Sequence, residues 1–465
     1  MGQETAFKIS DYIGKGMSIS TAPRRLCEMA KEEFTVPQQF QFELFPSPML
    51  PLAKMPDFTV PLECTTIGAT QPAQYFSRTA PDHVDQNAIL RLRRLPIPEA
   101  KVIRKLVECS RQGWLDGNQS VMYSHLSESV VTHFPLWVLT YWSLILDFKR
   151  DVRAYWVRSL DWVAKKKKTS RKNPARVALV EETMHILSML PWGWAKPPGL
   201  SDSEPAHNLW RFLGPHWLAG SQQNDMLELL RHKVDSNPEL AKKFRIQGVA
   251  LAAKILEAHN AGSETYRSSQ SFRWIRDIAD DLVRNEAALI STAHLGKIND
   301  KPHWIGLVFD FSQPTATIRY GDSFGEPMPA QLLAACRWWI AQHSEAHLML
   351  EDLPIGAQSD GFSCGMLVDN SLQHFVDSQV LLSVPGLSFV NARLEAFKKI
   401  AKWTLERLEV ARALATLEDE DSDDRSDHLT ATPVISISSD SDCDSAHDPR
   451  RTCPSLPHGK ALVRC

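Results

Sequence analysis

A predicted pair of β-strands between residues 301 and 325 constrains the fold more than any other feature of this sequence. The runs "WIGLVFDF" and "TATIRY" are rich in aromatic and β-branched residues, and the "SQP" between them has the composition of a turn. Amphipathic helices are expected on either side, over residues 221–234 and 391–417. The fold class expected from this pattern is α+β, with strands and helices in one domain.

The register of this hairpin brings a histidine and an aspartate together. Opposed residues in an antiparallel pair have positions with a constant sum, so a turn centred between Ser312 and Gln313 places His303 opposite Asp322. A turn centred on Pro314 shifts the register by a residue or two, yet both side chains remain at the open end of the hairpin. His294 lacks such a partner on the hairpin and is expected to be a strand histidine without a catalytic role.

The stretch "GAQSDGFSCGMLVDNSLQHF" at 356–375 adds a thiol at the predicted start of a helix. A thiolate is the reactive form of cysteine, and a nearby imidazolium or a helix N-terminus stabilises it. Cys364 is therefore a candidate nucleophile, with His303 as the base and Asp322 as the carboxylate that orients it. The amide of Gln358, six residues earlier, is a candidate donor to the oxyanion, a role typically worth ~3 kcal/mol. The alternative is that Cys364 is only a packing residue.

Taken together, His303-Trp304, Asp322-Ser323, Gln358 and Cys364-Gly365 stand in an order that resembles the ubiquitin-like-protein-specific (SUMO) cysteine proteases, an adenovirus-protease-like family. The resemblance, to divergent fungal-type members in particular, covers residues 206–417. It implies a papain-like fold with a central mixed sheet flanked by helices, and a monomer that needs no cofactor. It also implies cleavage after the Gly-Gly tail of SUMO or another ubiquitin-like modifier. Trp304 would border the channel for that tail, and Trp217 would be a second substrate contact.

Two positions depart from the family pattern. Ser363 stands before the nucleophile where the family commonly has Asp, and no acidic residue follows Trp217-Leu218. Both departures concern the surroundings of the modifier's tail, so they bear on which modifier is accepted. They remove none of the four candidate catalytic groups.

The rest of the chain divides by composition into four further segments. Ten prolines lie from Pro37 to Pro98, and residues 1–97 are therefore expected to be largely irregular. A separate, Trp-rich helical region is expected over 98–190, followed by a linker at 191–205. The stretch from 418 to 465 begins with an acidic, Ser-rich run that is expected to be disordered.

Two short stretches point to partners outside the active site. The basic run "KKKKTSRK" at 165–172 is typical of a nuclear-import signal or a nucleic-acid patch, and a solvated charged loop is the plain alternative. Val434, Ile435 and Ile437 precede acidic and serine residues in a segment that resembles a SUMO-interacting motif. Such a segment adds as a strand to the edge of a partner's sheet.

Composition excludes several other classes of protein. The longest apolar run, at 134–148, is too short for a membrane span, and the cysteines show neither CxxC pairs nor zinc-site spacing. The net charge of −3 argues against nucleic acid as the principal partner. The main alternative to an enzyme is a catalytically weak, protease-like binding module of mobile-element origin that recognises SUMO or another protein.

Overall fold

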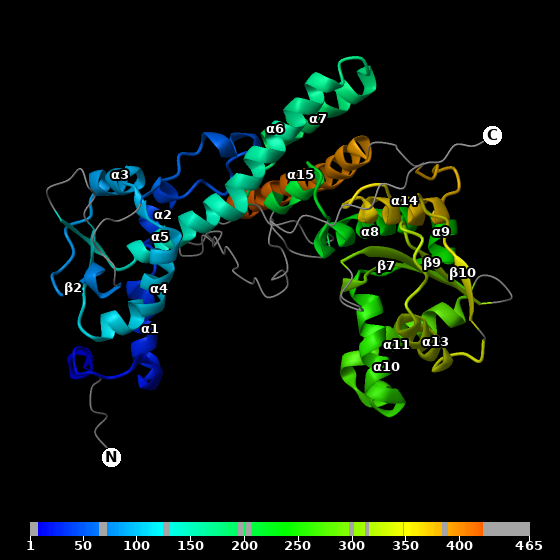
Figure 1. The fold of residues 1–465 in the computed structure, drawn as a ribbon, viewed down its shortest axis with the longest axis horizontal. Helices are drawn as coiled ribbons and strands as arrows, with labels where there is room; N and C mark the ends of the chain where they lie inside the picture. Colours follow the sequence, from blue (N-terminus) through cyan, green and yellow to red (C-terminus); the bar gives the residue numbers. More distant parts are fainter. Residues whose placement is uncertain are drawn as a thin grey trace, which may run out of the picture. The chain divides into compact units, whose positions relative to one another are not determined.

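The computed structural model describes residues 8–64, 72–123, 131–193, 200, 206–296, 302–311, 316–346, 348–383 and 389–421. The chain forms two compact units (Figure 1). Among the described residues, the first unit contains the chain up to Arg158 together with Pro191–Gly193, and the second contains Ser159–Leu190 and the residues from 206 onward. No helix in the described ranges combines the length and the apolar character that a bilayer span requires.

The first unit is helical with small strand pairs. Its elements are α1 (Arg24–Glu33), α2 (Gln38–Leu44), α3 (Gln86–Arg94), α4 (Ala100–Leu115), α5 (Val138–Asp147), β1 (Glu63–Cys64), β2 (Phe76–Ser77), β3 (Ile97–Pro98), β4 (Ser120–Tyr123) and β5 (Thr132–Pro135). The strands pair as β1-β3 and as β2-β4-β5. Helix α5 continues through a π-helical turn, Phe148–Arg153, into α6 (Ala154–Thr169). Trp142 and Trp156 on this continuous helix are almost fully buried, as the aromatic spacing predicted.

The division between the units differs from the sequence-based segments. The predicted boundary at 97 falls inside the first unit, where α1 packs against α4. The predicted boundary at 190 is displaced for a different reason, because α7 (Pro174–Met189) packs along α15 (Val390–Asp421) within the second unit. The Glu182 carboxylate on α7 is bonded by Lys398 at 3.3 Å and by Lys402 at 2.5 Å, and both lysines lie on α15.

The second unit is built around a mixed five-stranded sheet. The strands are β6 (Phe244–Ile246), β7 (Ala288–His294), β8 (Trp304–Asp310), β9 (Thr317–Gly321) and β10 (Met349–Asp352), in the order β10-β9-β8-β7-β6. The three central strands are antiparallel, and the two edge strands pair with their neighbours in parallel. The predicted α+β class with a central mixed sheet is confirmed.

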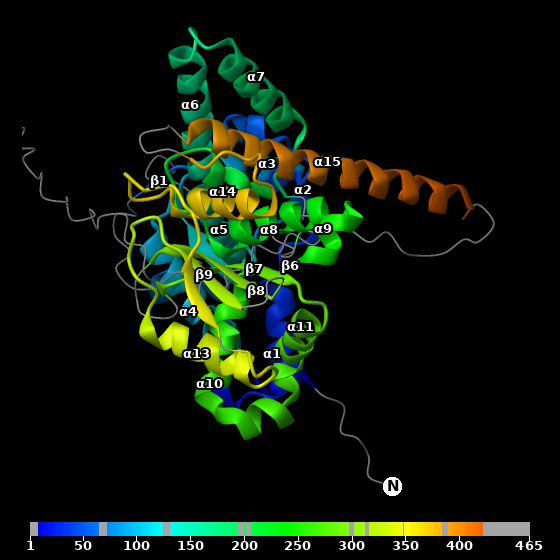
Figure 2. The ribbon, with the colours of Figure 1, turned by 90° about the vertical axis from the view of Figure 1, so that its right-hand side faces the viewer.

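Helices cover both faces of this sheet (Figures 1 and 2). The helices of the unit are α8 (Gly220–Asp235), α9 (Pro238–Lys243), α10 (Ala250–Ser268), α11 (Arg273–Arg284), α13 (Ala330–Ala341) and α14 (Cys364–Val376), besides α6, α7 and α15. On β8, Ile305 and Phe309 face the core with α10, α11 and α13, whereas Trp304 and Val308 face the core with α8 and α14. This alternation follows from the two-residue period of a strand.

Two helices lie where the sequence predicted them. The helix expected over 221–234 is α8, and the helix expected over 391–417 is α15. Helix α15 continues to Asp421, so the acidic run that begins at residue 418 starts within a helix and not outside it. The segment with Val434, Ile435 and Ile437 lies outside the described residues.

Candidate active site

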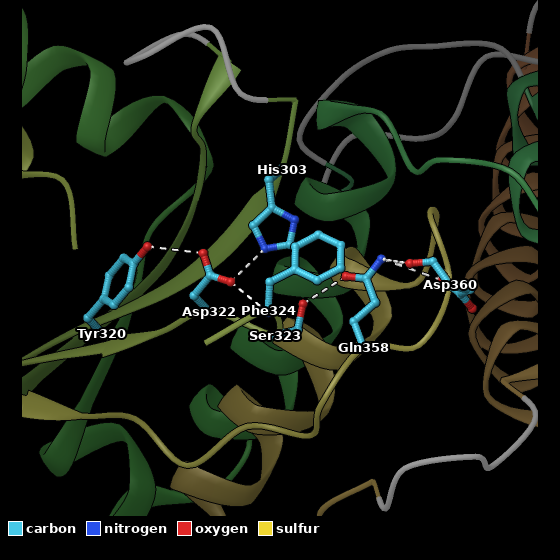
Figure 3. A network of polar contacts seen from close by, with 7 residues as sticks. All are labelled: His303, Tyr320, Asp322, Ser323, Phe324, Gln358 and Asp360. Atoms are coloured by element: carbon cyan, nitrogen blue, oxygen red, sulfur yellow. Dashed lines mark hydrogen bonds and ion pairs between the residues drawn. The ribbon is translucent and has the colours of Figure 1, made fainter. Parts of the chain in front are cut away.

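His303 and Asp322 lie next to each other at one end of the central sheet. His303 immediately precedes β8 and Asp322 immediately follows β9. Nε2 of His303 is 3.1 Å from Oδ1 of Asp322, and both residues are buried. Figure 3 shows the imidazole and the carboxylate facing each other across the hairpin.

The register of the hairpin differs from the prediction by two residues. Leu307 pairs with Tyr320 and Gly306 with Gly321, so the position opposite His303 is Phe324 and not Asp322. The His303–Asp322 bond is therefore diagonal. It forms nevertheless because both residues lie just beyond the ends of their strands, where diagonal neighbours on a sheet remain within reach of each other.

The Asp322 carboxylate is held by the residues around it. Its Oδ1 accepts a hydrogen bond from the backbone N–H of Phe324 at 2.7 Å, and its Oδ2 accepts one from the Tyr320 hydroxyl at 3.2 Å (Figure 3). Burial would raise the pKa of Asp322, but hydrogen bonds from His303, Phe324 and Tyr320 lower it overall. The carboxylate is thus ionised at neutral pH and fixed in orientation.

His303 is a cation at neutral pH in this setting. Burial lowers the pKa of the imidazole, but hydrogen bonds with Asp322 and Cys364 and the charges of both partners outweigh it and raise the pKa to about 9. One face of the ring is stacked on Phe324, with centroids 4.7 Å apart and planes at 28°. The phenyl ring is 53% exposed, so it stands between the imidazole and solvent.

Cys364 is the first residue of α14 and is only 2% exposed. Its neighbour Gly365 lies so close to the Gln223 side chain of α8 that a Cβ at this position would clash with it. The loop before the thiol is organised by Asp360, whose Oδ1 accepts the backbone N–H groups of Phe362 at 2.9 Å and Ser363 at 2.8 Å. The N-terminus of a helix favours negative charge, so the start of α14 favours the thiolate form of its first residue.

Ser363 is buried and takes part in the same loop. Its hydroxyl donates to Oδ2 of Asp360 at 2.6 Å. Asp360 thus accepts bonds from three groups of the two residues before the nucleophile. The sequence reading missed this role of Asp360, although an Asp three residues before a Ser is a known local signal for a side-chain-capped turn.

Gln358 joins the nucleophile loop to the end of β9. Its Oε1 accepts the Ser323 hydroxyl at 2.9 Å, and its backbone N–H donates to the Ser323 carbonyl at 2.8 Å. Its Nε2 donates to the Asp360 carbonyl at 2.6 Å (Figure 3). The amide has two N–H groups, and donation to an oxyanion has to use the second one or replace the bond to Asp360.

The two predicted substrate-contact tryptophans differ in their exposure. Trp304 is 4% exposed, and its indole N–H donates to the Leu218 carbonyl at 2.7 Å, which fixes the segment before α8 against the sheet. Trp217, next to Leu218, is half-buried. His294 lies opposite Trp304 on β7, with ring centroids 4.7 Å apart, and is not part of the Asp322 network in Figure 3.

No family model and no curated protein matches this sequence. One solved structure similar to the chain is the SUMO protease Ulp1 with its catalytic cysteine oxidised to a sulfenic acid, at 14% identity and a TM-score of 0.36, covering 49% of this chain and 95% of that one. A second is a de-sumoylating protease, at 10% identity and a TM-score of 0.31, covering 48% and 93%. A third is the Xanthomonas campestris effector XopD bound to ubiquitin, at 17% identity and a TM-score of 0.26, covering 38% and 90%.

Two of these neighbours are named as proteases of the kind that the sequence motifs resemble.

Proposed function

We propose that the second unit is a cysteine-type isopeptidase or endopeptidase that hydrolyses the bond after the C-terminal Gly-Gly of a ubiquitin-like modifier, with SUMO as the preferred modifier. The observation that carries this proposal is the buried imidazole of His303 held between the Asp322 carboxylate and the Cys364 thiol. A nucleophile, a base and a third group that orients the base are the parts that covalent acyl transfer needs.

Acylation follows from these positions. The Cys364 thiolate attacks the carbonyl carbon of the terminal glycine, and the oxygen of that carbonyl becomes an oxyanion to which the Gln358 amide donates. The His303 imidazolium then gives its proton to the nitrogen of the leaving amine, so the C–N bond breaks and a thioester forms. The raised pKa of His303 keeps that proton available at neutral pH.

Hydrolysis of the thioester uses the same groups in reverse. Neutral His303 takes one proton from water as the water oxygen attacks the thioester carbonyl, and the C–S bond breaks to release the carboxylic acid of the modifier, which loses the second proton of the water to solvent. The imidazolium and the thiolate are thereby restored. Asp322 keeps the ring in one orientation in both steps and stabilises its cation, without itself exchanging a proton.

The burial of the nucleophile supports a Gly-Gly tail as the substrate. Cys364 is 2% exposed, and Trp304 and Leu218 beside it are similarly buried. Residues with large side chains directly before the scissile bond would have to displace these packed side chains. Glycines, which lack a side chain, need the least room for a close approach of backbone to thiol.

Covalent labelling tests this proposal. SUMO and ubiquitin, each carrying a C-terminal vinyl sulfone, are incubated with the full chain, with Cys364→Ser and with Cys109→Ser, a matched control at an exposed cysteine. We expect labelling by the SUMO probe of the wild type and of Cys109→Ser, and none of Cys364→Ser. Labelling that maps to Cys336 would contradict the assignment of the nucleophile, and binding of SUMO without labelling would favour the binding module.

Two further proposals concern the surroundings of the protease. We propose that the basic run at 165–172 serves nuclear import. Among its lysines, Lys165 pairs with Asp161 at 2.6 Å and Lys167 pairs with Glu181 at 3.1 Å, all at exposed positions.

We also propose that Val434, Ile435 and Ile437 bind SUMO as an added strand, so that their replacement by Ala slows trimming of poly-SUMO chains more than processing of a single modifier.

A further inference from the structure

A buried arginine lies behind the nucleophile loop. Arg393, on the first turn of α15, is 2% exposed and is among the largest fully buried side chains of the described residues. Its Nη1 donates to the Arg211 carbonyl at 3.0 Å, and its Nη2 donates to the carbonyls of His216 at 2.7 Å and Phe362 at 3.0 Å. Its guanidinium carbon also lies 5.4 Å from the centre of the Phe362 ring.

Two of these carbonyls belong to separate segments next to the candidate site. Phe362 is two residues before Cys364, in the loop that Asp360 organises. His216 is next to Trp217 and two residues before Leu218, whose carbonyl accepts the indole N–H of Trp304. One guanidinium therefore ties the nucleophile loop to the segment that precedes α8, through the rigid fork that distinguishes Arg from Lys.

Burial of this cation is costly and calls for a function. Removing a guanidinium from water costs several kcal/mol, and a close carboxylate partner usually offsets this cost. None of the three hydrogen bonds found for Arg393 goes to a carboxylate, and its Nε has no hydrogen-bond partner among the described residues. A packing role alone would be served better by an apolar side chain of similar volume.

The positive charge of Arg393 interacts electrostatically with Asp360 and Cys364. Burial lowers the pKa of Arg393 to about 10, while the charges of Asp360 and Cys364 act in the opposite direction, so the guanidinium stays charged at neutral pH. His303, which is bonded to Asp322 of the hairpin, also interacts with Cys364. Helix α8 presents the neutral amide of Gln223 beside Gly365.

We propose that Arg393 is a positioning residue for the nucleophile, which fixes the loop of Cys364 against the segment of Trp217 and supplies a positive charge that favours the thiolate. The inference rests on the proposed role of Cys364 as nucleophile. One side chain makes two contributions. The hydrogen bonds of the guanidinium fix the position of the nucleophile loop, and its positive charge increases the reactivity of Cys364 at low pH.

Alkylation of Cys364 by iodoacetamide tests the charge without any modifier as substrate. The rate at Cys364 is followed by peptide mass spectrometry at pH 6 and pH 9 in the full chain, for the wild type, Arg393→Gln and Arg393→Lys. We expect Arg393→Gln to react about tenfold more slowly than the wild type at pH 6 and within about twofold of it at pH 9, because loss of a nearby opposite charge acts where the thiolate is scarce. We expect Arg393→Lys, which keeps the charge, to retain the wild-type ratio of the two rates.

The outcomes divide as follows. The proposal is wrong if Arg393→Gln slows alkylation equally at both pH values. It is also wrong if Arg393→Lys shows a pH-dependent loss as large as that of Arg393→Gln. If thermal melting shows that Arg393→Gln is unfolded, the test uses Arg393→Lys alone: a tenfold fall in the ratio of its alkylation rates at pH 6 and pH 9 contradicts the charge effect, and an unchanged ratio supports it. Failure of the wild-type Cys364 to react faster than the exposed Cys109 contradicts the proposed function itself.

Discussion

The two sides of the candidate site are held in place in different ways. On the hairpin side, the imidazole of His303 and the carboxylate of Asp322 are fixed by Tyr320 and Phe324, which belong to the same hairpin or its immediate end. On the nucleophile side, the loop before Cys364 depends on Arg393 and, through it, on carbonyls far earlier in the chain. Local strand geometry builds one side, and long-range polar contacts build the other.

This difference predicts which substitutions act through chemistry and which act through position. Changes on the hairpin side should alter catalysis and its pH dependence and leave the nucleophile loop in place. Changes on the nucleophile side should alter the approach of the substrate to the thiol as well. The following predictions test that division, beginning with the largest expected effect.

The largest effect after loss of the thiol is expected for His303→Ala. Removal of the base and acid should lower kcat for cleavage of a SUMO precursor by about 10⁴-fold, the upper range for general acid–base catalysis. His294→Ala is the matched control, because that ring also contacts Trp304 but lies outside the Asp322 network, and we expect a loss of less than about threefold. Rates are measured at saturating precursor by gel densitometry, and equal losses in the two variants would contradict the assignment of His303.

A smaller loss is expected for Asp322→Asn. The variant keeps the hydrogen-bonding shape and loses the charge that stabilises the imidazolium, so we expect kcat to fall by roughly 10³-fold, between the two histidine variants. KM should change little, because Asp322 is buried behind His303 and away from the substrate. Steady-state kinetics on the same precursor measure both constants, and a change confined to KM would show that Asp322 acts on binding.

Gln358→Ala tests the junction between the two sides. Loss of the oxyanion donor should lower kcat about 100-fold, equivalent to ~3 kcal/mol. Ser323→Ala is the control, because it removes only the hydroxyl that donates to Oε1 of Gln358, and we expect a loss of about tenfold or less. If Ser323→Ala lowers kcat as much as Gln358→Ala does, Gln358 holds the loop in position and does not act on the oxyanion.

The contrast between the two sides also explains what the sequence predicted. A β-hairpin has few possible registers, and a misplacement by two residues still left His303 and Asp322 within 3.1 Å, because both lie beyond the strand ends. The start of α14 at Cys364 was equally readable from local composition. The partners of Arg393 were not, because hydrogen bonds to backbone carbonyls at 211 and 216 leave no pattern in side-chain types.

The stacking of Phe324 on His303 and the capping of the loop by Asp360 fall between these cases. Each involves residues close in sequence, yet each depends on a turn whose conformation the composition alone does not determine.

The extent of the first unit could not be predicted for a third reason. Helix α1 packs against α4, and the ring of Phe40 on α2 contacts Trp137; a proline-rich composition indicates frequent turns without excluding such packing.

The smallest effect predicted is the pH dependence of stability, which should come from the hairpin side. The pKa of His303 is raised to about 9 in the folded chain, whereas an unfolded histidine titrates near 6.5. The protonated imidazole of His303 therefore stabilises the folded chain fully below about pH 6.5, and this contribution is lost as the pH rises through about 9. The lowered pKa of Asp322 sets the opposite limit, because its contribution is present above about pH 4 and is lost as the pH falls below that value.

On the nucleophile side, the lowered pKa of Arg393, about 10, makes stability depend on pH only above that value, so its contribution stays constant between pH 6.5 and 9. We therefore expect the free energy of unfolding in urea to fall by about 2 kcal/mol more in the wild type than in His303→Ala between pH 6.5 and pH 9.5. Asp322→Asn should show an intermediate fall, because it lowers the pKa of His303 without removing the ring. Parallel curves for the wild type and His303→Ala would mean that folding does not raise the pKa of the imidazole, and the division of the site into a charged hairpin side and a positioning nucleophile side would be wrong.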